Sequence, residues 1–190
     1  MAALCQHALL TAMSEVWHRI RGTSPEDARP TSPVTHLVVM QHGLHGYPSQ
    51  MRSLKDAILL ASKDAGVWVV RSNQSEHFFM THSGVDVLGD HLYQFICEKA
   101  REAGWTERRG PNDPPRRLSI VGHSLGGITA RFALGLMHAS NWFADHDASP
   151  HAYISCASPH VGVSVEAAIK ALRIDGALSH GIDLRGCVGC

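Results

Sequence analysis

One serine in this chain stands between two glycines, in Gly122-His-Ser-Leu-Gly126, after the apolar run 118–121 and before a stretch with helical spacing. The pattern G-x-S-x-G is typical of a sharp turn from strand to helix. Such a turn lifts a serine hydroxyl above the sheet, while the glycines make room for neighbouring chains. A hydroxyl held in this way can attack an acyl carbon. We therefore predict that Ser124 is a catalytic nucleophile. The alternative is a glycine-rich turn that opens a helix beside a phosphate, although the lysine of a P-loop is missing.

A second glycine-rich segment, His42-Gly-Leu-His-Gly46, follows an apolar, β-branched run. Attack on an ester carbonyl places negative charge on its oxygen, and two backbone N–H groups can stabilise that charge. One donor is the residue after the nucleophile, here Leu125, and the other comes from the loop after an earlier strand. We predict Leu44 as this second donor, in a loop that Gly43 and Gly46 allow to turn tightly. Taken alone, the loop is equally well explained as a short connection between a strand and a helix.

Four segments in this order resemble the serine esterase family of α/β-hydrolases, a lipase-like group: HLVVMQHGLHG, THSGVDVLGDHL, GHSLGGITARFALG and SCASPHVG. Together they span about residues 35–165. The resemblance implies an α/β-hydrolase fold and hydrolysis of carboxylic esters, in particular lipid or acyl-glycerol esters. It also implies Ser124 as nucleophile and the N–H groups of Leu44 and Leu125 as oxyanion hole. Ser158-Pro159-His160 would then lie near the rim of the site as a structural loop.

Apolar runs alternate with stretches of helical spacing, which predicts βαβ units and a parallel sheet. Strands are expected at 35–41, 66–71, 118–121 and 152–157, helices at 50–65, 85–103, 125–139 and 163–174, and a polar loop at 141–151. The strands are continuous apolar runs, as in strands that helices cover on both faces. With the resemblance, the fold class is α/β: a partial α/β-hydrolase fold with a mostly parallel sheet of about four strands flanked by helices.

The core is expected at residues 34–175, between an N-terminal helix and linker at 1–33 and an irregular tail at 176–190. The first 22 residues have the pattern of an amphipathic helix, which we expect to dock on the core. Contact with a membrane surface or a lipid droplet is the alternative. No run reaches the ~20 apolar residues of a membrane span.

The general base and its acid partner are not identified. In α/β-hydrolases they follow the serine on loops after later strands, and only one more convincing strand follows Ser124. Asp175 and His180 have the right order, but no strand separates them. His160 has no orienting carboxylate nearby in sequence, and His123 is expected to pack inside. We expect a fragment, cut after the fourth strand, whose last strand is an open sheet edge unless the C-terminal segment covers it.

The composition excludes some classes of function. Lys+Arg and Asp+Glu are 17 each, so nothing favours nucleic acid as a partner. The 14 histidines are scattered, and no motif predicts a metal or another cofactor. Of the five cysteines, Cys97 and Cys156 lie in apolar runs and are expected to be buried, while Cys187 and Cys190 form an isolated CxxC. We expect a reduced, cytoplasmic protein.

These patterns favour a serine esterase or lipase that acts on a small-molecule or lipid ester. The main alternative is a module with a hydrolase-like fold that binds an acyl chain or a protein and performs no chemistry. A histidine-rich metal protein is a third interpretation. Acyl length, head group and oligomeric state stay open.

Overall fold

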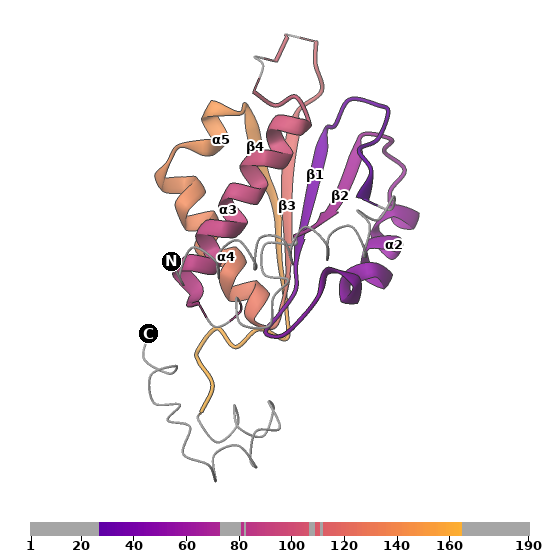
Figure 1. Cartoon of the computed structure of the whole chain (residues 1–190). Coiled ribbons are helices and arrows are strands. Elements are labelled where there is room, and N and C mark those ends of the chain that lie inside the picture. The colour runs from indigo at the N-terminus through magenta and orange to yellow at the C-terminus, as the bar shows by residue number, and fades with distance from the viewer. Residues whose placement is uncertain (1–26, 73–80, 82, 107–108, 111, 165–190) are drawn as a thin grey trace, which may run out of the picture.

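The computed structural model describes residues 27–72, 81, 83–106, 109–110 and 112–164 (Figure 1). Four parallel strands form one sheet in the order β2-β1-β3-β4. The strands are β1 (His36–Gln41), β2 (Val67–Arg71), β3 (Arg116–His123) and β4 (Ala148–Cys156). The helices are η2 (Pro48–Met51), α2 (Arg52–Ala61), α3 (Val85–Glu102), α4 (Leu125–Ala139) and α5 (Trp142–Asp145). The predicted α/β class, with a parallel sheet of four strands flanked by helices, is confirmed.

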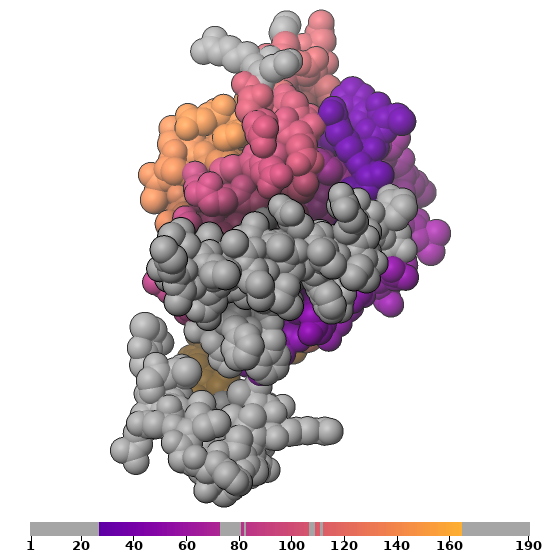
Figure 2. All heavy atoms as spheres, viewed as in Figure 1, coloured from indigo at the N-terminus to yellow at the C-terminus, as the bar shows by residue number. Residues whose placement is uncertain are grey.

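Helices lie on both faces of the sheet because alternate residues of each strand point to opposite sides. On β1, Leu37 and Val39 belong to the larger core cluster, with residues of α3 and α4. Val38 and Met40 belong to a smaller cluster with Met51, beside α2. On the face seen in Figure 2, the rose surface of α3 lies beside the orange surface of the segment around α5. The middle of each central strand, 37–40 in β1 and 118–121 in β3, is therefore apolar apart from Ser119, as the sequence predicted.

The helix expected at 50–65 is shorter than predicted, and the polar loop expected at 141–151 is wrong. The first begins with the 3-10 turn η2 and ends at Ala61. The second contains α5 and the start of β4, which begins at Ala148 rather than at 152. Trp142 explains the helix: it is 2% exposed and stacks on His146, with ring centroids 4.2 Å apart. One large apolar side chain thus fixes a segment whose composition is polar.

Strands β2 and β4 lie at the two edges of the described sheet, and β4 differs from the other three strands in its exposure. Most of its residues are exposed, including Cys156, so the expectation that Cys156 is buried is wrong. Cys97, on α3, is half-buried. In the part of the chain that the structure describes, β4 pairs with β3 alone. The C-terminal segment on which the prediction of an open edge depends lies outside the described residues.

Several expectations lie outside the described residues. They are the helix at 1–22, nearly all of the helix at 163–174, the tail at 176–190, and the side chains of Asp175, His180, Cys187 and Cys190. Within the described ranges, no helix is long and apolar enough to cross a membrane.

A histidine on β1 is held in its neutral form. The ring of His36 meets that of His151 edge-on at 4.9 Å between centroids, and its Nε2 is 2.8 Å from Oγ of Ser119. Partial burial first, and then the nearby charges of His151 and Arg117, lower the pKa of His36 from 6.5 to about 4, although Asp64 opposes the shift. Because a proton binds this ring more readily in the unfolded chain, protonation favours unfolding.

We therefore expect stability to fall as the pH drops from about 6.5 to about 4, since the unfolded state binds the extra proton in that window. Above pH 6.5 this contribution is fully present. Urea unfolding at a series of pH values measures it. The variant His36→Asn should lose less stability across the window than the native chain. Equal losses in the two proteins would contradict the assignment.

Candidate functional site

Ser124 is the single residue between β3 and α4, and its backbone is strained. Its φ is 54° and its ψ is −125°, a region that non-glycine residues rarely adopt. Two hydrogen bonds hold it there: its N–H donates to the carbonyl of Cys156 at 2.8 Å, and its carbonyl accepts from the N–H of Gly127 at 3.1 Å. Such strain costs on the order of 1–3 kcal/mol and persists only where the surroundings enforce it.

The two glycines of the motif face backbone and have no room for a side chain. A Cβ on Gly122 would lie 2.5 Å from the carbonyl oxygen of Gly126 and from the nitrogen of Gly127. A Cβ on Gly126 would overlap the carbonyl oxygens of Gln41 and His42, where β1 ends. The first turn of α4 therefore packs directly on the backbone of β1, as the sequence pattern predicted.

The loop after β1 reaches the serine itself. A Cβ on Gly43 would lie 2.7 Å from Cβ of Ser124 and 3.2 Å from its Oγ. The N–H of Gly46 donates to the carbonyl of Gly43 at 3.0 Å, which closes the loop into a tight turn. His42 is buried, and its Nδ1 lies 3.0 Å from the same carbonyl. The predicted loop and the predicted nucleophile are thus in contact.

The two predicted oxyanion donors lie in the segments that meet at Ser124. Leu125 is the first residue of α4, and Leu44 follows the glycine that touches the serine side chain. Both residues are half-buried. Their positions suit the predicted role, and the role itself stays a prediction.

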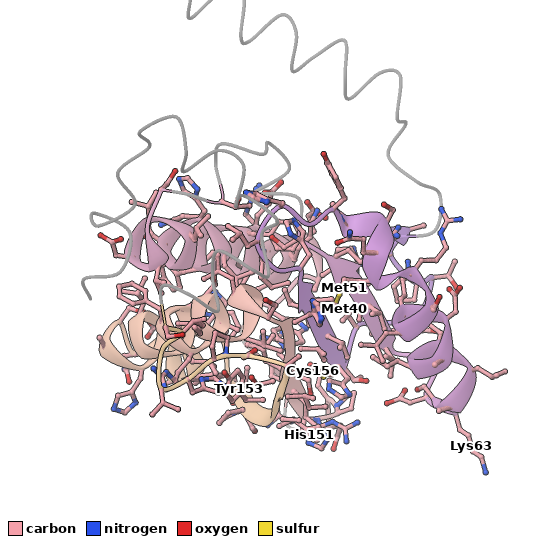
Figure 3. All side chains as sticks on the ribbon, turned by 90° about the horizontal axis from the view of Figure 1, so that it is seen from below. Met40, Met51, Lys63, His151, Tyr153 and Cys156 are labelled. Carbon is pink, nitrogen blue, oxygen red and sulfur yellow. The ribbon has the colours of Figure 1, made fainter. Side chains whose placement is uncertain are left out.

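A cluster of hydroxyl groups from β4 and its following loop supports the other side of the turn. Oγ of Ser155 is 2.6 Å from where a Cβ on Gly127 would lie, and Ser158 is nearer still. Oγ of Ser155 also lies 2.6 Å from Nε2 of His160. Tyr153 donates from its hydroxyl to the carbonyl of Gly127 at 2.8 Å. Figure 3 shows Tyr153 and Cys156 at the β4 side of the molecule, away from α2.

Ser158-Pro159-His160 follows β4 near the serine turn, as the family resemblance implied. The contacts of Tyr153, Ser155 and Gly127 were not predicted from the sequence. The signal for Gly127 was the doubled glycine at the start of α4. The signal for the hydroxyl groups was weak, because serine and tyrosine in a strand have many ordinary uses.

No imidazole among the described residues forms a hydrogen bond with Oγ of Ser124. His160 is engaged by Ser155. His123 is exposed, so the expectation that it packs inside is wrong. The ring of His42 faces the loop carbonyl. No group of three His, Cys, Asp or Glu residues in the described ranges could hold a metal ion.

A parallel sheet with a strained serine between a strand and a helix defines an α/β-hydrolase-type protein. The chain belongs to the family described as "Putative serine esterase (DUF676)", which matches residues 31–174. The fold class and the family predicted from the sequence are both confirmed. The family is one of serine esterases and lipase-type hydrolases.

Two yeast proteins illustrate the relationship. "Putative lipase C4A8.10" of Schizosaccharomyces pombe (strain 972 / ATCC 24843) is 32% identical over 150 residues, 78% of this chain and 18% of the relative. "Putative lipase ROG1" of Saccharomyces cerevisiae (strain ATCC 204508 / S288c) is 30% identical over 148 residues, 75% of this chain and 20% of the relative. The chain therefore spans about a fifth of the length of these relatives.

Among solved structures, the chain is similar to RedJ, a thioesterase from the prodiginine biosynthetic pathway in Streptomyces coelicolor. The TM-score is 0.46 at 16% identity, over 85% of this chain and 62% of that chain. RedJ with a PEG molecule bound in its active site gives a TM-score of 0.47 at 16% identity, over 78% of this chain and 58% of that chain.

Two glycines of α4 provide a matched test of the close packing at the turn. We expect Gly126→Ala to lower the free energy of unfolding by about 1–3 kcal/mol, because its methyl group would overlap the end of β1. Gly135→Ala should raise it by about 1 kcal/mol, because that position has open space and alanine favours the helix. Urea unfolding measures both. A stabilised Gly126→Ala variant would show that the turn has more room than the structure gives it.

Proposed function

We propose that this chain carries the nucleophile and the oxyanion hole of a serine esterase that acts on carboxylic esters, with lipid esters as the preferred class. Ser124 is the nucleophile, and the N–H groups of Leu44 and Leu125 are the donors to the oxyanion. The observation that carries the proposal is the strained Ser124 in contact with the glycine loop after β1. The lipid preference is supported by the names of the yeast relatives.

The proposed reaction has two steps. Oγ of Ser124 attacks the ester carbonyl carbon and gives up its proton to a base, while the two N–H groups stabilise the negative oxygen. The carbon–oxygen bond to the alcohol then breaks, and the protonated alcohol leaves an acyl group on Ser124. A water molecule attacks this acyl-enzyme in the same way, which releases the carboxylic acid and restores the serine. In this scheme Ser124 carries the acyl group, and the N–H groups of Leu44 and Leu125 bind the oxyanion. No described residue is assigned as the base.

A glycine at position 43 fits the proposed chemistry. It allows the loop backbone to lie within van der Waals distance of the serine side chain, where a donor on the next residue can reach the same carbonyl. Each such donor typically contributes about 3 kcal/mol of transition-state stabilisation. The close contact therefore has a catalytic reason as well as a packing reason.

A binding module is the second candidate function. One observation supports it: no histidine among the described residues forms a hydrogen bond with Oγ of Ser124. In that case the same surface would hold an acyl chain without turnover. The strain at Ser124 argues for the enzyme instead, since a residue with a more favourable backbone would relieve the strain if no hydroxyl were needed.

A fluorophosphonate probe separates the two functions because it labels activated serines. We expect labelling of the native chain at Ser124, found by mass spectrometry of the modified peptide, and no labelling of that peptide in Ser124→Ala. Ester hydrolysis should fall in the same variant, by ~10⁴-fold or more if the site is complete.

Ser149→Ala is the matched control, because Ser149 is an exposed serine at the other end of β4. It should be labelled like the native chain. Labelling of a different serine, or equal ester turnover by the native chain and Ser124→Ala, would contradict the esterase. An unlabelled chain that binds a fluorescent fatty acid would support the binding module.

Gly43→Ala tests the contact between the loop and the serine. The added methyl group would lie 2.7 Å from Cβ of Ser124, so the loop or the serine must move. A displacement of about 1 Å at a reacting group can lower a rate by ~10²-fold. We expect the second-order rate of probe labelling to fall by this order, while circular dichroism stays native. The control variant Gly135→Ala, on the exposed side of α4, should be labelled at the native rate. Equal labelling rates for the native chain and both variants would show that the loop after β1 is not part of the site.

A further inference from the structure

The first turn of α4 is held between two strands. On one side, a Cβ on Gly126 would overlap the carbonyl oxygens at the end of β1. On the other side, a Cβ on Gly127 would overlap the hydroxyl groups of Ser155 and Ser158, on β4 and its following loop. Such contacts limit how closely the turn approaches each strand, but van der Waals attraction has no preferred direction. The orientation of the turn therefore depends on hydrogen bonds, which do have one.

Strand β4 bonds this turn at two points. The carbonyl of Cys156 accepts the N–H of Ser124 at 2.8 Å, and the hydroxyl of Tyr153 donates to the carbonyl of Gly127 at 2.8 Å. The first bond holds the residue where the turn begins, and the second holds a residue at the far side of the turn. Because two fixed points define the direction of a short segment, this pair of bonds sets how the peptide groups between them are aimed. Leu125 lies between the two points.

Tyr153 is well suited to fix the second point. It pairs in register with Ile120, which belongs to the core cluster that includes residues of α4. Paired residues of neighbouring strands point to the same face of a sheet, so Tyr153 extends from β4 toward α4. Its side chain has two rotatable bonds and is ordered at low entropic cost. A carbonyl oxygen has two lone pairs, so the carbonyl of Gly127 can accept the hydroxyl proton as well as a helical N–H.

The serine hydroxyl groups near this turn are bonded within β4 and its following loop. Oγ of Ser155 lies 2.6 Å from Nε2 of His160, and Ser158 donates to the carbonyl of Cys156 at 3.4 Å. The hydroxyl of Tyr153, by contrast, bonds across to α4. Its removal is therefore the change that releases the helix while leaving the loop after β4 intact.

We propose that Tyr153 is a positioning residue for the nucleophile: its hydroxyl holds the first turn of α4 so that the N–H of Leu125 and the hydroxyl of Ser124 are aimed at one carbonyl group. This inference rests on the proposed function, to which it adds an orienting group that does not touch the substrate. Without the hydroxyl, the turn would rotate and relieve part of the strain at Ser124, whose φ is 54°. The N–H of Leu125 would then be less well aligned with the oxyanion.

Tyr153→Phe and Tyr93→Phe form a matched pair of variants. Tyr153 bonds to the first turn of α4, while Tyr93 donates to Oγ of Ser140 at 3.1 Å, and Ser140 caps the other end of the same helix. Each variant loses one hydroxyl group and keeps its aromatic ring. We expect a similar small decrease in the midpoint of urea unfolding for both, because each loses a single hydrogen bond. A difference in reactivity between them then reports on the position of the bond.

The kinetics of labelling by the fluorophosphonate probe, measured over a series of probe concentrations, test the role in the native 190-residue chain and both variants. Tyr153→Phe should lower the maximal labelling rate at Ser124 by about 10-fold and leave the half-saturating probe concentration unchanged. The reason is that the orientation of the reacting groups changes, while the surface that binds the probe does not. Tyr93→Phe should keep the native maximal rate. Equal maximal rates for the native chain and Tyr153→Phe would overturn the proposal.

Amide hydrogen exchange gives a second readout that needs no labelling. The amides of Ser124 and Gly127 should exchange about 10-fold faster in Tyr153→Phe, because the bonds of both N–H groups depend on the orientation of the turn. They should exchange at the native rate in Tyr93→Phe. A native chain without label at Ser124 would contradict the proposed function, and exchange alone then decides whether Tyr153 holds the turn. Unchanged exchange in Tyr153→Phe overturns the proposal in either case.

Discussion

The close approach of backbone to backbone beneath Ser124 is the constraint on which the rest of the site depends. The first turn of α4 rests on the carbonyl groups at the end of β1, and the loop after β1 rests on the serine side chain. Both contacts occur only because glycine stands at positions 126 and 43. Side chains there would push the helix from the sheet, and the serine would lose the backbone conformation that exposes its hydroxyl. The position of the serine is therefore set by the main chain, which is stiffer than any side-chain network.

Helix α4 links this site to the core. Its first residues form the turn, while Ala130, Ala133 and Met137 further along are fully buried against the sheet and α3. The two alanines let α4 lie close to the sheet. The position of α4 that fills the core is therefore also the position that holds Ser124 in its turn. A substitution that shifted α4 by a fraction of an ångström would change both the packing of the core and the geometry of the site. We conclude that stability and site geometry are coupled through one rigid element.

The sequence predicted the parts of the fold that depend on local pattern. The apolar run before His42 predicted β1, and the pattern G-x-S-x-G predicted that β3 turns directly into α4. Both predictions succeeded because apolar runs and glycine spacing depend directly on how the backbone packs. It failed where a distant contact decides the structure. The segment at 141–151 is polar, yet Trp142 packs in the core beside Trp105, and the centroids of the two rings are 6.4 Å apart. A short helix forms around this buried tryptophan. Cys156 was misjudged for a related reason: an apolar run does not show which of its side chains other elements will cover.

Strand β4 has two roles that meet at its carboxyl end. Its last carbonyl accepts the N–H of Ser124, its tyrosine holds the first turn of α4, and its Ser155 engages His160 beside Gly127. The same residues, 152–156, form the exposed edge of the sheet. A strand hydrogen-bonded on one side opens more easily than one bonded on both, since fewer contacts must break. Movement of residues 152–156 would therefore move the serine turn with it, because the carbonyl of Cys156 and the hydroxyl of Tyr153 are bonded directly to that turn.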